Sequence, residues 1–381
     1  MTPDQHADVH AHLSFQNPRH DSLRGKHLVD LRLRDRDTIV TKEGILFRVY
    51  GYSHPAKAYI CDPEYATANI YRSEDPRSLR TSGSKAFYKF YADEGLRFVR
   101  QNYPRHTVWH EQLCQRLVAV QQDNIEAARR PDKTLQALLQ RNRADLLLQA
   151  LKSLLDLVLQ GSGLSDGDFG VFGSLLNNFH HPDFSDLDFI IYGSEKSKCL
   201  RATLEALYQE VTSPLRNEFE DLDSVKNKVW KFSHYTPEEY VWHQKRKQIY
   251  GLYHHQKSGR TIKAEFEPVR QWDEIRNEYN QAARIERKGW VKLLARVKDD
   301  REAGFMPSIY QIEPIKVLKG ETTDCPQRVV SFVEEFRLQA QRDELAIVEG
   351  NLEQVLGPKE FRQVTLTYGP GYYEQTLKVA T

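Results

Sequence analysis

Two aspartates one residue apart, Asp186 and Asp188, have the type and spacing of a metal-binding pair. They lie in the run DLDFIIY, which predicts a β-strand that ends at Gly193. Side chains alternate along a strand, so both carboxylates should project from one face while Leu187 and Phe189 project from the other. Like charges this close repel each other unless a cation lies between them. Hard oxygen ligands of this type favour Mg²⁺ (or Mn²⁺) held jointly with substrate phosphates.

A glycine and a serine, Gly173 and Ser174, supply a complementary feature twelve positions before the first aspartate. They follow a short apolar run, residues 169–172, that predicts a buried strand. A glycine at a strand end lets the backbone approach a phosphate closely, and a serine hydroxyl can donate to its oxygens. The two residues therefore predict a loop that binds nucleotide phosphates beside the aspartates.

The combined pattern, Gly-Ser, eleven residues and then Asp-x-Asp in a hydrophobic strand, resembles the signature of the DNA polymerase β-like nucleotidyltransferase superfamily. The flanks resemble, more loosely, a group of uncharacterised and largely archaeal predicted nucleotidyltransferases. The resemblance implies a mixed sheet with helices, a divalent cation, and an NTP substrate, with ATP the expected nucleotide. It also implies transfer of a nucleoside monophosphate to a hydroxyl acceptor with release of pyrophosphate. The acceptor could be an RNA end, a protein side chain or a small molecule. The alternative is a non-catalytic RNA- or nucleotide-binding module that retains the fold.

The superfamily places a third carboxylate on a later strand beside the Asp-x-Asp strand. Residues 259–269 alternate cleanly and predict such a strand, with Glu265 and Glu267 on one face. Glu265 is favoured, because Pro268 puts Glu267 at a strand margin. The resemblance thus implies four catalytic candidates, of which three would bind the metal. The catalytic candidates are Asp186, Asp188, Glu265 and Glu267, and the metal ligands are Asp186, Asp188 and Glu265.

A basic and aromatic stretch lies between residues 226 and 263, with nine Lys or Arg, two acidic residues and seven Phe, Trp or Tyr. This mixture suits phosphate contact with base stacking, and Lys245 and Arg246 are candidate nucleotide-binding residues. The alternative is an amphipathic helix whose cationic side chains extend over the core. Thr236 and Glu239 form a capping-box pattern that opens a helix running to about Gln248.

The totals add limits to this interpretation. The chain has 54 basic and 53 acidic side chains, so any basic surface must be local. Four widely spaced cysteines without a C-x-x-C motif fit reduced thiols in a cytoplasmic protein. The N-terminal residues lack a signal-peptide pattern and no apolar run reaches 18 residues, so we expect a cytoplasmic protein without a membrane partner.

The expected fold class is α+β, with four segments along the chain. A leucine stripe predicts helix over 108–160, a second helix is expected over 272–287, and alternating runs predict strands near the C-terminus. The segments are a flexible N-terminal tail (1–28), a small β-containing domain (29–105), a nucleotidyltransferase domain (106–299), and a small antiparallel β-barrel or sandwich (300–381).

Overall fold

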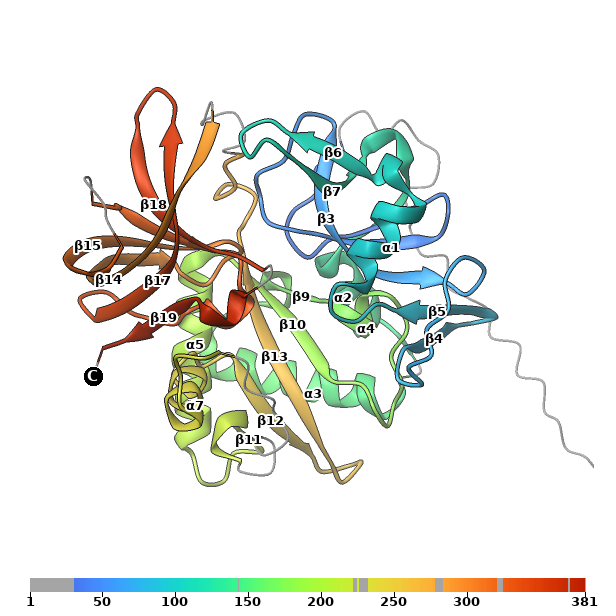
Figure 1. The fold of residues 1–381 in the computed structure, drawn as a ribbon. Coiled ribbons are helices and arrows are strands. Elements are labelled where there is room, and N and C mark those ends of the chain that lie inside the picture. The colour runs from blue at the N-terminus through green and yellow to red at the C-terminus, as the bar shows by residue number, and fades with distance from the viewer. Residues whose placement is uncertain are drawn as a thin grey trace, which may run out of the picture.

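The computed structural model describes residues 31–380, except 143, 222–224, 226–231, 278–283, 321–324 and 369–370. The described chain has a mixed α+β fold with three sheets and few helices (Figure 1). The predicted tail, residues 1–28, lies outside the described part. No described helix is long and apolar enough to cross a membrane.

The N-terminal sheet has eight strands, in the order β4-β5-β3-β2-β1-β8, and β7 pairs with both β3 and β6. Its strands are β1 (Thr38–Thr41), β2 (Ile45–Val49), β3 (Ala58–Thr67), β4 (Leu79–Ser82), β5 (Lys85–Lys89), β6 (Thr107–His110), β7 (Gln115–Gln121) and β8 (Ile125–Arg129), with α1 (Glu94–Asn102) between β5 and β6. The prediction of helix from residue 108 is wrong up to residue 129. The buried run in β7 pairs with β3, and this long-range pairing decides the conformation. The sheet therefore extends past the predicted boundary at residue 105.

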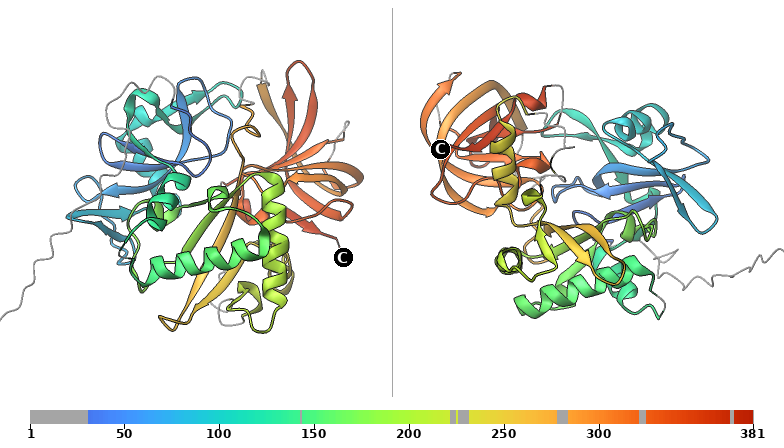
Figure 2. Two further views of the ribbon diagram at one scale, coloured as in Figure 1. Left: turned by 180° about the vertical axis from the view of Figure 1, so that it is seen from behind. Right: turned by 90° about the horizontal axis from the view of Figure 1, so that it is seen from below.

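The central sheet has the strand order β11-β12-β13-β10-β9. Its strands are β9 (Phe169–Val171), β10 (Leu187–Tyr192), β11 (Leu215–Asn217), β12 (Tyr250–His255) and β13 (Arg260–Val269). Only β10 and β13 pair in parallel among these strands. Its helices are α2 (Pro131–Leu139), α3 (Leu146–Ser162), α4 (Gly173–Leu176) and α5 (Ser194–Gln209). The leucine stripe of α3 and the apolar side of α5 form one core with the inner sides of β10 and β13. Figure 2 shows α3 and α5 covering this face of the sheet from behind.

The C-terminal sheet has six strands, and β14 pairs with both β15 and β17, so the path β14-β15-β16-β18-β17 closes on itself. The strands are β14 (Arg284–Glu302), β15 (Ser308–Lys319), β16 (Arg328–Ser331), β17 (Leu345–Leu356), β18 (Phe361–Leu366) and β19 (Thr376–Val379). The pair β16–β18 is parallel, so the sheet is not purely antiparallel as expected. It begins at Arg284, ahead of the predicted boundary at residue 300. The helix expected over 272–287 is wrong for 284–287, which pair with β17, while 278–283 lie outside the described residues.

The other face of the central sheet is turned toward the two flanking sheets. In Figure 1 the N-terminal sheet (blue) and the C-terminal sheet (red) lie on either side of the upper ends of β10 and β13. A further helix, α7 (Pro237–Lys245), packs Tyr240 against the C-terminal core, and Tyr235, just before the helix, packs there too. The predicted capping box at Thr236 and Glu239 is confirmed, and the helix ends three residues before the predicted Gln248.

Candidate active site

Asp188 and the two glutamates share one face of the central sheet, and Asp186, which the sequence placed in the strand, lies one residue before β10 begins at Leu187. In the parallel pair of β10 and β13, Asp188 is the direct partner of Glu265, and Ile190 is the partner of Glu267. On the opposite face Phe189 and Phe266 stack with their ring centroids 5.1 Å apart inside the core. A slip of one residue would expose these rings, so burial of the aromatic pair fixes the register that sets Asp188 beside Glu265.

The glycine-serine loop contacts the second aspartate directly. Gly173 begins α4 with a positive φ of +62°, and a Cβ at this position would lie 2.6 Å from Oδ2 of Asp188. Both the conformation and the lack of space therefore require glycine. The side chain of Asn177 donates to the Gly173 carbonyl at 3.1 Å and accepts a hydrogen bond from Arg129 at 2.8 Å. Arg129 lies at the end of β8, so the N-terminal sheet supports the loop; no motif in the sequence indicated this role.

The electrostatics of the aspartate pair favour a bound cation. The pKa of Asp188 is raised to about 7, first by burial and then by the nearby Asp186 and Glu267, while Lys263 and Lys89 oppose the shift. Loss of hydration also raises the pKa of Asp186, against the effect of Lys263. Neither carboxylate accepts a hydrogen bond or forms an ion pair with a described residue. An oxygen-liganded cation would relieve both the repulsion and the missing contacts.

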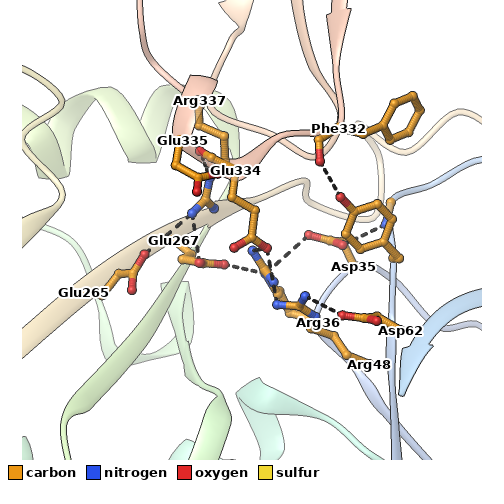
Figure 3. A network of polar contacts seen from close by, with 12 residues as sticks. Asp35, Arg36, Arg48, Asp62, Glu265, Glu267, Phe332, Glu334, Glu335 and Arg337 are labelled. Carbon is orange, nitrogen blue, oxygen red and sulfur yellow. Dashed lines mark hydrogen bonds and ion pairs between the residues drawn. The ribbon is translucent and has the colours of Figure 1, made fainter. Parts of the chain in front are cut away.

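Glu267 has a different environment from Glu265. It is 3% exposed and forms ion pairs with Arg36 and with Arg337, the latter at 2.9 Å. Burial alone would raise its pKa, but Arg337 and Arg36 hold the pKa of this carboxyl below its usual value. Arg36 precedes β1 and Arg337 follows the short turn Glu334–Phe336, so one glutamate joins all three sheets. Figure 3 shows the two guanidinium groups on either side of Glu267.

The ion pairs around Glu267 extend into the flanking sheets. Glu334 contacts Arg36 at 2.9 Å and Arg48 at 3.3 Å, and Arg48 also reaches Asp62 at 3.1 Å (Figure 3). Several buried charges that each have an opposite partner can be tolerated in a core, whereas removal of one partner is costly. We therefore assign Glu267 to the contact between the sheets.

Glu265 lies at the edge of this network and faces the site. Its side chain is 19% exposed, and its closest ion-pair contact is Arg337 at 3.5 Å. Burial and the neighbouring Glu267 raise the pKa of Glu265 to about 8, with Arg337 and Lys263 opposing. Of the two glutamates, Glu265 pairs with Asp188 across the two strands. The expectation that Pro268 puts Glu267 at a strand margin is wrong, because β13 continues through Pro268 to Val269.

The site fits a metal at the aspartate pair. Within the described residues, no group of three or more His, Cys, Asp or Glu side chains is arranged to hold a metal ion. The expected set of Asp186, Asp188 and Glu265 is therefore not preformed, since Arg337 lies against Glu265. The two aspartates by themselves present oxygen ligands of the kind that Mg²⁺ shares with phosphate groups.

The two candidate nucleotide-binding cations have partners within the protein. Lys245 lies 2.7 Å from Glu220, and Arg246 lies 2.5 Å from Glu344 with its guanidinium group 4.4 Å from the ring centroid of Trp242. Lys245 is the last residue of α7 and Arg246 directly follows it, so both side chains reach toward neighbouring elements. Neither is brought into contact with the aspartate pair.

The other described cations of the basic stretch are dispersed as well. Lys247 is fully buried and donates to the Glu335 carbonyl at 2.5 Å, and Lys257 donates to Gln149 at 2.6 Å. Arg260 donates from both terminal nitrogens to the carbonyls of residues 182 and 185, each at 2.8 Å, and so holds the segment that leads into Asp186. The stretch does not form one continuous basic surface over its described part; positions 226, 228, 230 and 231 lie outside it.

Comparisons with known proteins agree with this site. Residues 149–250 match the family model described as a nucleotidyltransferase domain, which includes the glycine-serine loop and the aspartate pair. The chain is 25% identical over 342 residues to an uncharacterised protein of Methanocaldococcus jannaschii, covering 89% of this chain and 96% of that protein. No solved structure matches the chain. The resemblance inferred from the sequence is thereby confirmed: residues 149–250 carry a domain of the nucleotidyltransferase family, within a chain similar to an uncharacterised archaeal protein.

Proposed function

We propose that this protein is a metal-dependent nucleotidyltransferase that transfers a nucleoside monophosphate from an NTP, with ATP expected, to a hydroxyl acceptor and releases pyrophosphate. Nucleotidyltransferase domains generally use a divalent metal and an NTP, which supports the proposal at the level of the domain. The observation that carries it is the direct approach of Gly173 to Asp188, because it sets a phosphate-binding loop against an unpaired carboxylate.

Each residue of the site has a role in this reaction. Gly173 and Ser174 hold the triphosphate through close backbone approach and a hydroxyl donor. Asp186 and Asp188 would hold Mg²⁺ or Mn²⁺, which when bound stabilises negative charge on the attacking and leaving oxygens. Glu265 accepts the proton of the attacking hydroxyl, a task that suits a carboxyl whose pKa of about 8 lies near the working pH.

Three of the candidate residues from the sequence have no role in the proposed reaction. Glu267 forms ion pairs with Arg36 and Arg337, and we assign it a structural role beside the site. Lys245 and Arg246 are engaged with Glu220 and Glu344, so we do not include them in the nucleotide site. A cytoplasmic location remains part of the proposal, and it is supported by the four cysteines being free.

The rival interpretation is a module that binds a nucleotide or RNA without catalysis. It would be favoured if both glutamates faced the solvent, away from the aspartates. Instead Glu265 is largely buried and pairs with Asp188 in the sheet. This arrangement favours an enzyme, since a binding module has no need for a third carboxylate beside a cation site.

The test is a transfer assay with α-labelled NTPs, Mg²⁺ or Mn²⁺, and fractionated cell extract as the source of acceptors. We expect the parent protein to label one acceptor class, and the double variant Asp186→Ala, Asp188→Ala to lose both labelling and binding of the metal-NTP complex. Asp183→Ala is the matched control, because this exposed aspartate lies on the same segment but outside the site. Undiminished binding by the double variant would show that the assigned site is wrong. NTP binding without pyrophosphate release, in every acceptor pool, would favour the binding module.

A further inference from the structure

A cavity lies beside Glu265, between the central sheet and the C-terminal sheet. The cavity has a volume of about 230 Å³ and is lined by residues from β12, β13, α7 and the turn before Arg337. The residues that matter for recognition are Tyr240, Gln244, Tyr250, Glu265, Glu335 and Tyr368. Its size suits one small-molecule group, because it is smaller than the pockets that enclose drug-sized ligands.

The position of the cavity relative to the aspartates follows from the strand register. Tyr250 of β12 is the partner of Glu265, and Glu265 is in turn the partner of Asp188. The three residues therefore form one line across the sheet, with the glycine-serine loop beyond Asp188 at one end and the cavity at the other. A group in the cavity would meet the α-phosphate from the side of Glu265, opposite the loop that holds the leaving phosphates.

A buried amide in the cavity wall has no partner. Gln244 is 2% exposed, and its Nε2 has no hydrogen-bond acceptor among the described residues. An unsatisfied buried donor costs about 1–3 kcal/mol. A hydroxyl oxygen of a bound molecule would supply the missing acceptor.

The charge of the wall indicates what else that molecule carries. The wall has four glutamates, at 218, 265, 334 and 335, against two cations, Lys263 and Arg337. Glu218 lies 3.6 Å from Lys263, and Glu334 is engaged with arginines of the N-terminal sheet. The carboxylate of Glu335 contacts only the Tyr368 hydroxyl, at 2.9 Å, among the described residues. Tyrosine rings beside a carboxylate that forms no ion pair within the described residues are a favourable setting for an ammonium group.

We propose that this cavity binds the acceptor of the transfer reaction and that the acceptor is a small hydroxyl-bearing amine, an inference that rests on the proposed function. One hydroxyl accepts from Gln244, and the ammonium group lies against Glu335 and the tyrosine rings. A second hydroxyl attacks the α-phosphate: its oxygen bonds to phosphorus, the bond from phosphorus to the bridging oxygen breaks, pyrophosphate leaves, and the hydroxyl proton passes to the Glu265 carboxylate. A nucleic-acid end is disfavoured, since its phosphates would lie beside the carboxylate of Glu335.

The test compares matched probes that differ in one group, an ammonium in place of a hydroxyl: glucosamine with glucose, and 4-aminocyclohexanol with cyclohexane-1,4-diol, alongside a short oligoribonucleotide. Binding is measured by calorimetry on the full chain with Mg²⁺ and a non-hydrolysable NTP, and pyrophosphate release is measured with the NTP itself. We expect the amines to bind about tenfold to a hundredfold more tightly than the neutral analogues, as a charge-assisted contact provides. Glu335→Gln should remove this preference, and Gln244→Leu should weaken binding of the amine and of its neutral analogue alike. Glu360→Gln is the control, because Glu360 is an exposed glutamate in the connection between β17 and β18, away from the cavity.

Two outcomes would overturn the inference: no amine probe binds, or the neutral analogues bind as tightly as the amines in the parent protein. Because amines and neutral analogues are compared on the parent protein, this test of the inference does not depend on whether a variant folds. Pyrophosphate release with the oligoribonucleotide alone would overturn the acceptor assignment while the proposed function stands. Amine binding that depends on Glu335, without pyrophosphate release under any condition, would leave the cavity as a binding site and contradict the transfer reaction, and with it the acceptor role.

Discussion

Exchange of Glu267 for glutamine should destabilise the protein strongly, because it removes the anion between two buried guanidinium groups. Arg36 and Arg337 are only 1% and 2% exposed in these pairs. Breaking a buried ion pair by removing one partner costs about 3–5 kcal/mol. Arg36 keeps Glu334 and Arg337 keeps a contact with Glu265, so we expect the lower value, about 3 kcal/mol. At about 2–4 °C per kcal/mol, Tm should fall by about 6–12 °C.

The same exchange at Glu265 should leave stability unchanged near pH 4 and raise it at neutral pH. With a pKa of about 8, folded Glu265 is mostly protonated at pH 7, and glutamine copies that neutral form, whereas the glutamate of the unfolded parent is ionised. We expect the variant to be more stable than the parent at pH 7, by up to about 3 kcal/mol. The folded pKa is raised above the unfolded value of 4.5, so the parent loses stability as pH rises from 4.5 toward 8. The variant should lack this loss, which for one group is at most about 1.4 kcal/mol per pH unit.

The assay is urea unfolding followed by tryptophan fluorescence, with chelator present, at pH 5, 7 and 8.5. Pyrophosphate release of the folded variants is measured in parallel. Glu267→Gln should show the lower midpoint and retain transfer where it is folded, whereas Glu265→Gln should have a midpoint that is close to the parent's at pH 5 and higher at pH 7 and 8.5, and should lose transfer. The reverse pattern, with Glu265→Gln unstable and Glu267→Gln stable but inactive, would refute the division of roles between the two glutamates.

Three further predictions concern the segments around the aspartate pair. Gly173→Ala should lose most NTP binding by calorimetry, since its Cβ would lie 2.6 Å from Asp188 and the positive φ adds about 1–2 kcal/mol of strain. Asp188→Asn should raise Tm in EDTA at and above pH 7 but not near pH 3, because burial raises the pKa of this carboxyl from 3.8 to about 7 and the parent loses stability over that range. Arg260→Lys keeps the charge but loses hydrogen bonds to the carbonyls of Pro182 and Ser185, and should raise KM for the metal-NTP complex with an unchanged circular dichroism spectrum.

Specific results would contradict each of these expectations. Parental NTP affinity in Gly173→Ala would show that the loop does not contact the nucleotide. An equal gain in Tm for Asp188→Asn at pH 3 and pH 8 would exclude ionisation as its cause. An unchanged KM in Arg260→Lys would show that the segment before Asp186 is held by other contacts.

The sequence alone determined the local parts of the site. The alternation of apolar residues placed Asp188 and Glu265 on strands, and the glycine-serine pair at the end of the preceding strand marked the loop. The capping box placed the start of α7. These features are readable because they depend on neighbours within a few positions, through side-chain periodicity and the needs of a helix terminus.

Only the tertiary structure showed how the surroundings of the two glutamates differ. Glu265 and Glu267 have the same strand face and almost the same neighbours in sequence, yet Arg36 and Arg337, from sheets at opposite ends of the chain, engage Glu267 and leave Glu265 beside Asp188. The strands at 107–129 and the cavity with Gln244 also depend on partners far away in the chain. Charge pairing and strand pairing between distant segments leave no local pattern, because the energy that selects them appears only when the sheets pack together.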